Sequence, residues 1–235
     1  MFIYEHFPKN TEHQYLKRSI QMSDFEVLPS YDLKFFINGF KCKTHFKSII
    51  EPETNQFKME FEAAEEAKMI GHLKTMNNEK IENAVFIQRD YRTNNFVVEV
   101  SLRSKNIVKL CLFGDKKVNN TYSGIVDYQI KPTVPIEKAP LYCKVYSFPT
   151  SIYLYEPKEN DLKIGNEYSF KVSVVALEIA LVDNNKKWIY FNKDDSEENL
   201  WTIKYIPNVV GQLKLFVKIS QDKSFSGAFE YSVLV

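Results

Sequence analysis

Short runs of alternating apolar and polar residues fill most of this chain, a pattern typical of strands with one buried face. Two stretches show it clearly and resemble each other: TYSGIVDYQI at 121–130 and SFSGAFEYSVLV at 224–235. Each has an aromatic residue, then Ser-Gly, then alternation to its end. A glycine inside a strand costs stability, so its recurrence at Gly124 and Gly227 predicts a bulge or a close backbone approach.

The alternation also predicts which side chains of these stretches face a core. We expect Tyr128 and Tyr231 on the apolar faces, and Ile125 and Ala228 on the opposite faces. The similarity extends upstream, in two further pairs of segments: 106–117 with 211–223, and 94–102 with 198–206. Turns containing Asn or Asp separate these runs, as hairpins require. The chain therefore repeats its closing strands at a distance of 103 residues, counted between the serines of the two Ser-Gly pairs.

This repeat predicts an all-β fold with two tandem immunoglobulin-like antiparallel β-sandwiches and a short N-terminal extension. The segment KPTVPIEKAP holds three prolines and is typical of a linker. The expected organisation is an extension at 1–30, a first sandwich at 31–130, a Pro-rich linker at 131–140, and a second sandwich at 141–235. The extension is too apolar for a free tail, so we expect it to pack on the first sandwich.

Two segments required a choice between helix and strand. Ala and Glu in EFEAAEEAKMIGHLKT at 60–75 favour a helix, whereas the alternation on either side favours two strands joined by an acidic turn. We expect the two strands. A short helix is expected at 21–28, where Ser23 would cap the N-terminus and Glu26 would complete a capping box.

Composition adds mainly exclusions. With 31 basic and 30 acidic residues, the net charge is +1, which gives no electrostatic signature of nucleic-acid binding or of an anionic membrane surface. The most apolar window, VSVVALEIALV at 172–182, is too short to span a bilayer, so no membrane insertion is expected. The first residues lack the pattern of a signal peptide, and three widely spaced cysteines are typical of reduced thiols.

No residue pattern predicts a catalytic, metal or cofactor site. Cys42 and His45 would lie on opposite faces of a strand, so we expect a buried thiol and an exposed imidazole rather than a catalytic pair. We expect Cys111 to be buried. The four histidines lack metal-ligand spacing, and the acidic stretch at 192–199 lacks the spacing of a calcium loop. A solvated turn is expected there, with a partner-contact loop as the alternative.

Exposed aromatic pairs are the remaining candidates for binding. Tyr153 and Tyr155 alternate in SIYLYEP, so they share one face of a strand, where they would contact either a partner protein or the other sandwich. Trp188 and Trp201 lie in apolar runs and are expected in the core or between sheets rather than on a ligand platform.

The N-terminal stretch FIYEHFPKNTEHQYLKRSIQMSDFEVLPSYDLKFFINGF resembles a segment of the kyphoscoliosis peptidase and hillarin family. In that family a transglutaminase-like domain ends in an HFP…WQLL signature, followed by an F..LP….FF..G stretch and immunoglobulin-like modules. The matching residues are His6, Phe7, Pro8, Gln14, Leu16, Phe25, Leu28, Pro29, Phe35, Phe36 and Gly39. His13 stands where the family has tryptophan. The last module, from YLYEPKENDLKIGNEYSFKV onward, is also similar, so the resemblance covers most of the chain.

The resemblance implies a region C-terminal to the catalytic core, because the family's Cys, His and Asp precede the HFP signature. It implies no enzyme activity in this chain and no cofactor. The implied role is a protein-interaction or scaffold region in the cytoplasm, with cytoskeletal protein partners. The alternatives are an accessory or regulatory part of a transglutaminase-like cysteine peptidase, or a carbohydrate-binding sandwich. Phe2, Tyr4 and Phe7 would lose their cover without an upstream domain, so they are expected to bind a partner or to drive self-association.

Overall fold

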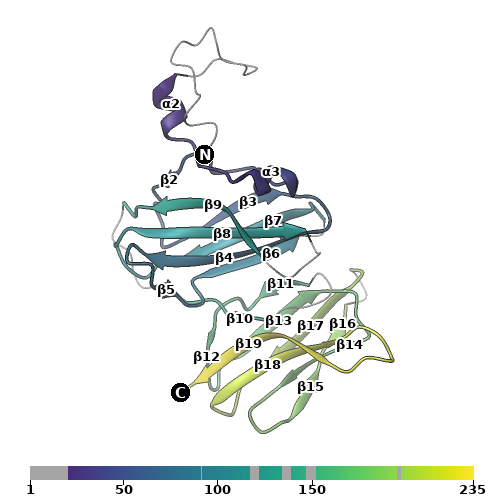
Figure 1. Ribbon diagram of the computed structural model, residues 1–235. Helices are drawn as coiled ribbons and strands as arrows, with labels where there is room; N and C mark the ends of the chain where they lie inside the picture. Colours follow the sequence, from purple (N-terminus) through teal and green to yellow (C-terminus); the bar gives the residue numbers. More distant parts are fainter. Residues whose placement is uncertain (1–20, 91, 117–121, 134–138, 147–151, 195–196) are drawn as a thin grey trace.

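The computed structural model describes residues 21–235 except 91, 117–121, 134–138, 147–151 and 195–196. The described chain forms two β-sandwiches, one above the other in Figure 1, each with its own hydrophobic core. The predicted packing of the N-terminal extension falls largely on residues 1–20, which lie outside the described residues. For residues 21–28 it was wrong, because the helix Met22–Glu26 has no buried residue and Leu28 is 41% exposed.

The first sandwich has one sheet of order β1-β3-β7-β6 and a second of order β2-β9-β8-β4-β5. All pairs are antiparallel except β2 with β9. Its elements are α2 (Met22–Glu26), α3 (Leu33–Ile37), β1 (Lys41–Cys42), β2 (Ile49–Ile50), β3 (Gln56–Glu62), β4 (Ala67–Thr75), β5 (Lys80–Ile81), β6 (Val85–Asp90), β7 (Asn95–Ser101), β8 (Val108–Lys116) and β9 (Ser123–Ile130).

The second sandwich has one sheet of order β11-β13-β17-β16 and a second of order β10-β19-β18-β14-β15, with β12 parallel to β19. Its elements are β10 (Lys144–Val145), β11 (Tyr153–Glu156), β12 (Asp161–Lys163), β13 (Tyr168–Ser173), β14 (Glu178–Val182), β15 (Trp188–Tyr190), β16 (Asn192–Lys193), β17 (Leu200–Tyr205), β18 (Gly211–Lys218) and β19 (Ser226–Leu234).

The two sandwiches share one topology. Strands β1 to β9 pair in the same order as β11 to β19, including the parallel contact of the second strand with the last. Strand β10 adds to the outer side of β19, and a single bridge between Tyr31 and Val126 occupies the same place on β9. These pairings confirm the all-β fold of two like sandwiches predicted from the repeat.

A bulge lies at the same place in each closing strand. In the first sandwich the register shifts between Leu112 and Phe113, so that Gly124 faces Phe113 and Ile125 is the extra residue. The second sandwich shifts between Leu215 and Phe216, so that Gly227 faces Phe216. The predicted equivalence of the two glycines is therefore confirmed.

In each closing strand, the residues between the Ser-Gly pair and the bulge were predicted on the wrong face of the sheet. Ile125 is 1% exposed and Ala228 is 1% exposed, although both were expected on the polar face. A bulge inserts one residue, so every side chain before it changes face. Gly124 points outward for the same reason.

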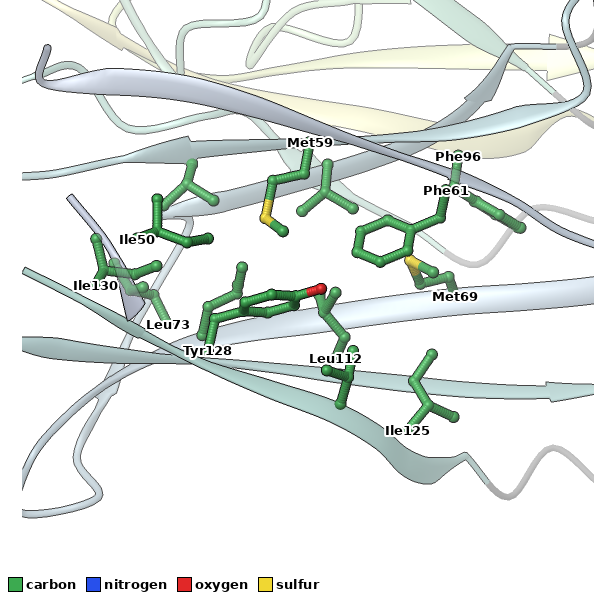
Figure 2. Packing of buried hydrophobic residues seen from close by; sticks show 14 of the residues in the cluster. Ile50, Met59, Phe61, Met69, Leu73, Phe96, Leu112, Ile125, Tyr128 and Ile130 are labelled. Carbon is green, nitrogen blue, oxygen red and sulfur yellow. The ribbon is translucent and has the colours of Figure 1, made fainter. Parts of the chain in front are cut away.

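Two buried tyrosines anchor the cores at equivalent positions. The hydroxyl of Tyr128 donates to the His45 carbonyl oxygen at 3.4 Å, and that of Tyr231 donates to the Pro157 carbonyl oxygen at 3.1 Å. Figure 2 shows the Tyr128 ring among the aliphatic and aromatic side chains of the first core. A buried hydroxyl needs such a partner, because an unpaired one would lose its hydration without compensation.

The helical predictions were partly right. Helix α2 begins at Met22, but Ser23 lies inside it, and its N-cap residue Gln21 makes no side-chain capping bond. The capping box was therefore wrong. Helix α3 was not predicted, because its residues Leu-Lys-Phe-Phe-Ile are also good strand formers. Asp32 starts it by accepting a hydrogen bond from the Lys34 backbone N–H at 2.9 Å.

The segment at 60–75 forms two strands, β3 and β4, joined by a turn at Glu65 and Glu66, as predicted. Its alanines are explained by packing: Ala63 and Ala67 are each 4% exposed and belong to the first core. Burial against the opposite sheet outweighs their helix propensity.

Candidate protein-interaction surface

The predicted binding residues fall in two places. Phe2, Tyr4 and Phe7 lie outside the described residues, so their role stays a prediction. Tyr153 and Tyr155 lie on β11, half-buried, with ring centroids 4.9 Å apart. Burial, together with nearby carboxylates, raises the pKa of Tyr153. Strand β11 lies beside β6, so the pair sits where the two sandwiches meet.

The apolar centre of this junction is Phe86 of β6. Its side chain is 1% exposed and belongs to the core cluster of the second sandwich rather than that of its own. Its ring lies 5.6 Å from that of Tyr142 and 6.3 Å from that of Phe229. Strand β6 therefore buries side chains on both faces, since Val85 and Ile87 pack on the first core.

Buried polar groups fix the orientation at this junction. The side-chain amide of Gln88 pairs with both backbone groups of Leu154: the Leu154 N–H donates to Oε1 at 2.9 Å, and Nε2 donates to the carbonyl at 3.2 Å. Beside it, Lys158 of the second sandwich forms an ion pair with Glu99 of β7. Because a displaced partner would leave Gln88 and the Leu154 backbone unpaired in the interior, this arrangement disfavours other relative orientations.

The segment expected as a linker is held against the first sandwich at its end. The Ser101 hydroxyl donates to the Pro140 carbonyl at 2.5 Å, and the Ala139 N–H donates to the Leu102 carbonyl at 3.3 Å. Residues 134–138 lie outside the described residues, so the boundaries at 131 and 140 stay a prediction.

The structure does not form a thiol–imidazole pair at Cys42 and His45. The Cys42 thiol donates to the backbone carbonyl of His45 at 3.0 Å, and the imidazole bonds to Thr44 Oγ1 at 2.9 Å. Strand β1 ends at Cys42, so the two residues are not on opposite faces of one strand, and both side chains are half-buried. The expected buried thiol and the expected exposed imidazole were therefore both wrong. Cys111 is 5% exposed, as predicted.

The sequence prediction missed an aromatic surface on the second sandwich. On the outer face of the β10-β19-β18-β14-β15 sheet, Ala180 pairs with Tyr190 of β15 on one side and with Phe216 of β18 on the other. In the next row, Val182 pairs with Trp188. Trp188 is 41% exposed and Tyr190 is 54% exposed. Only Trp201, 7% exposed, occupies the core position expected for both tryptophans.

Four rings form this surface, which we call the aromatic face: Trp188, Tyr190, Phe216 and Phe225. The Trp188 ring lies 4.8 Å from that of Phe225, 5.7 Å from that of Phe216 and 6.3 Å from that of Tyr190. Because the rings support one another, they stay exposed in a fixed arrangement. The alternation of Trp188 and Tyr190 around half-buried Ile189 was the sequence signal for an exposed pair.

Charged residues border the aromatic face along β18, β19 and β10. Glu230 accepts a hydrogen bond from the Tyr146 hydroxyl at 2.5 Å and lies 3.2 Å from Lys214 Nζ and 3.5 Å from Lys144 Nζ. Burial alone would raise the pKa of Glu230. The Tyr146 hydrogen bond and the two lysine charges outweigh burial and hold its pKa below the ordinary value.

This lowered pKa predicts a pH dependence of stability. A carboxylate whose pKa is lower in the folded than in the unfolded chain stabilises the fold above the ordinary pKa of about 4.3, and loses that contribution as the pH falls through the folded value. Glu230→Gln should therefore lower the free energy of unfolding at neutral pH, and the deficit should shrink below about pH 4. Urea unfolding of both proteins from pH 3 to 7 measures it. Glu198→Gln, on an exposed turn, is the control, and a deficit that does not change with pH would contradict the assignment.

Within the described residues, no group of His, Cys, Asp and Glu side chains is arranged to hold a metal ion. No helix in the same part of the chain is long and apolar enough to cross a membrane.

Comparisons with solved structures give distant matches. Titin domains Z1Z2, solved in complex with telethonin, are 11% identical, with 80% of this chain and 90% of that chain covered and a TM-score of 0.24. The neural ectodermal development factor IMP-L2 is 10% identical, with coverage of 85% and 96% and a TM-score of 0.28. No curated protein matches the chain.

A protein-family model gives the assignment. The model described as the KY-like, immunoglobulin-like domain matches residues 22–142, just over half of the chain. The match begins at α2, spans the first sandwich with its bulged closing strand, and ends at Tyr142, which packs on Phe86. The chain therefore belongs to the family of KY-like, immunoglobulin-like domains.

Proposed function

We propose that this chain is a non-catalytic scaffold region that binds a protein partner through the aromatic face of its second sandwich. The observation that carries the proposal is the cluster of four rings that contact one another. Two of these rings, those of Trp188 and Tyr190, are about half exposed. Trp and Tyr are the residues that most often dominate binding energy at protein interfaces.

The surroundings of the aromatic face favour a protein over a carbohydrate. The Trp188 and Phe225 rings meet at 60°, so the four rings form a contoured surface rather than one flat platform. Lys214, Lys144 and Glu230 lie along one side of the cluster. An apolar centre with a charged border is the usual anatomy of a protein interface.

The resemblance to the kyphoscoliosis peptidase and hillarin family supplies the cellular setting of the proposal. It favours a cytoplasmic protein with cytoskeletal partners, in which the sandwiches follow a transglutaminase-like domain. Membership of the KY-like domain family supports this setting at the level of the domain.

Removal of the exposed rings should abolish partner binding without unfolding the protein. We expect the double change Trp188→Ala and Tyr190→Ala to weaken binding at least about 30-fold, since a buried aromatic anchor contributes roughly 2 kcal/mol or more. Proteins that the immobilised chain retains from a cell extract containing cytoskeletal proteins should be lost with this variant. The purified partner then gives the dissociation constants by calorimetry.

Ile206→Ala is the matched control, because Ile206 is 50% exposed and lies just after β17, in the opposite sheet. It should retain the same partners as the unmodified chain. Equal retention by all three proteins would contradict a role for the aromatic face. Binding to a glycan array that depends on Trp188, with no retained protein, would favour the carbohydrate alternative.

A further inference from the structure

A groove of about 680 Å³ runs between the two sandwiches along β4. One wall is β4 with the start of β6, and the other is the segment from Cys143 to Tyr146, which includes β10. In Figure 1, β4 lies at the edge of the upper sandwich that faces the second one. Lys144 and Tyr146 line this groove as well as the border of the aromatic face, but none of the four rings of that face lines the groove.

Strand β4 is an edge strand over half of its length. On one side it pairs with β8 through all nine of its residues. On the other side only Leu73 and Lys74 pair with β5, and the Thr75 N–H donates to the Glu79 carbonyl at 2.8 Å. On this second side, the segment from Ala67 to His72 pairs with no strand among the described residues.

The alternation of hydrogen-bond direction along β4 identifies the backbone groups that face the groove. In an antiparallel pair, alternate residues direct both backbone groups to the same neighbour. Thr75 directs its N–H away from β8, so Gly71 and Met69 do the same. In the part of the chain that the structure describes, neither the Met69 N–H nor the Gly71 N–H has an acceptor.

Arg89 closes the first end of this edge. Its guanidinium donates to the carbonyls of Ala64 at 2.8 Å and Ala67 at 3.2 Å, and also reaches those of Ala63 and Glu65. A side chain from β6 thus satisfies the carbonyls where β4 begins. The stretch from Met69 to Gly71, between Arg89 and β5, remains without such cover.

Apolar side chains form part of the floor and of the far wall of the groove, beside charged residues such as Lys80 and Lys144. Half-buried Val85 and Ile87 lie beside Gly71, where a Cβ atom would come within 2.9 Å of Ile87 Cδ1. Across the groove, Val145 is 46% exposed. The Tyr146 N–H donates to Ala228 of β19, so the backbone groups of Val145 point away from β19.

We propose that this groove binds an extended peptide segment of a protein partner, which adds to β4 as a further strand. An edge with unpaired N–H groups is complemented by another strand, and apolar side pockets then select alternate side chains. The uncovered stretch from Met69 to Gly71 is short and is bounded by Arg89 and by β5, which suits one extended segment rather than the edge of a whole sheet. Exposed Glu65 and Glu66 lie beside Arg89 where β4 begins, and they favour Lys or Arg at that end of the bound segment.

A phage-displayed library of linear dodecapeptides, selected against the intact chain, supplies the probe. We expect the enriched peptides to alternate β-branched or aromatic residues with polar ones and to carry a basic residue near one end. In amide hydrogen exchange followed by NMR, such a peptide should slow exchange at Met69 and Gly71 at least about tenfold. Exchange at Lys68 and Ile70, which already pair with β8, should change little.

Three comparisons make the result decisive. The same peptide with N-methyl groups at alternate residues should bind at least about tenfold more weakly, because it cannot complete the ladder. The double substitution Glu65→Lys and Glu66→Lys should weaken binding of the basic peptides to a similar extent. The Trp188→Ala variant should bind them unchanged, so failure here is distinguishable from failure of the aromatic face. No enriched peptide, or protection only at other amides, would overturn the proposal.

Discussion

Phe86→Ala should lower the free energy of unfolding by about 3–5 kcal/mol, because it removes a fully buried ring and leaves a cavity. Phe86 belongs to β6 of the first sandwich, but its ring packs on Tyr142 and Phe229 in the core of the second. Both tryptophans lie in the second sandwich, so their fluorescence during urea unfolding reports on that module. We expect their transition to move to lower urea although the substitution lies in the other module.

Phe113→Ala is the matched control for this experiment. Phe113 lies on β8 with its ring half-buried on the outer face of the first sandwich, so its loss should cost about 1 kcal/mol. It should also leave the fluorescence transition nearly unchanged. If Phe86→Ala moved that transition no further than Phe113→Ala does, the junction would not couple the two modules.

Tyr231→Ala is expected to cost about 3–5 kcal/mol as well, since the side chain is 0% exposed in the centre of the second core. Tyr231→Phe retains the ring and removes only the hydroxyl that bonds the Pro157 carbonyl, so it should cost about 1–2 kcal/mol. The repeat predicts the same order for Tyr128, whose hydroxyl bonds the His45 carbonyl.

Thermal unfolding of the four tyrosine variants compares the two modules directly. Alanine should cost more stability than phenylalanine at both positions, because the packing of the ring contributes more than one hydrogen bond. A Tyr128 series that differed in order from the Tyr231 series would mean that the two closing strands are not energetically equivalent.

The architecture could be predicted from the sequence because the same pattern of closing strands occurs twice in the chain. A spurious alternation in one stretch is common, but agreement between 121–130 and 224–235 in both glycine and tyrosine is not. The bulges were predicted from Gly124 and Gly227, but their effect on Ile125 was not. Which side of a glycine receives the extra residue depends on the register with the neighbouring strand, and local sequence does not determine it.

The junction and the aromatic face could not be predicted in the same way. From the sequence, Phe86 and Met59 both have the pattern of a core residue of the first sandwich. In the structure Met59 belongs to the first core, whereas Phe86 belongs to the second core because the second sandwich docks against β6. Trp188 and Trp201 both lie in apolar runs, but β15 is an edge strand whereas β17 lies between β13 and β16. Exposure therefore depends on strand order, which a local pattern does not contain.

Residual dipolar couplings of backbone amides, measured in a single alignment medium, test most directly whether the two like sandwiches form one fixed unit. If the contacts of Phe86 and Gln88 hold the modules together, couplings from β1 to β9 and from β10 to β19 will fit one common alignment tensor. Tensors of different magnitude would mean that the modules move independently, and tensors of different orientation would mean that they dock in another arrangement. Either result would contradict a unit fixed by Phe86 and Gln88.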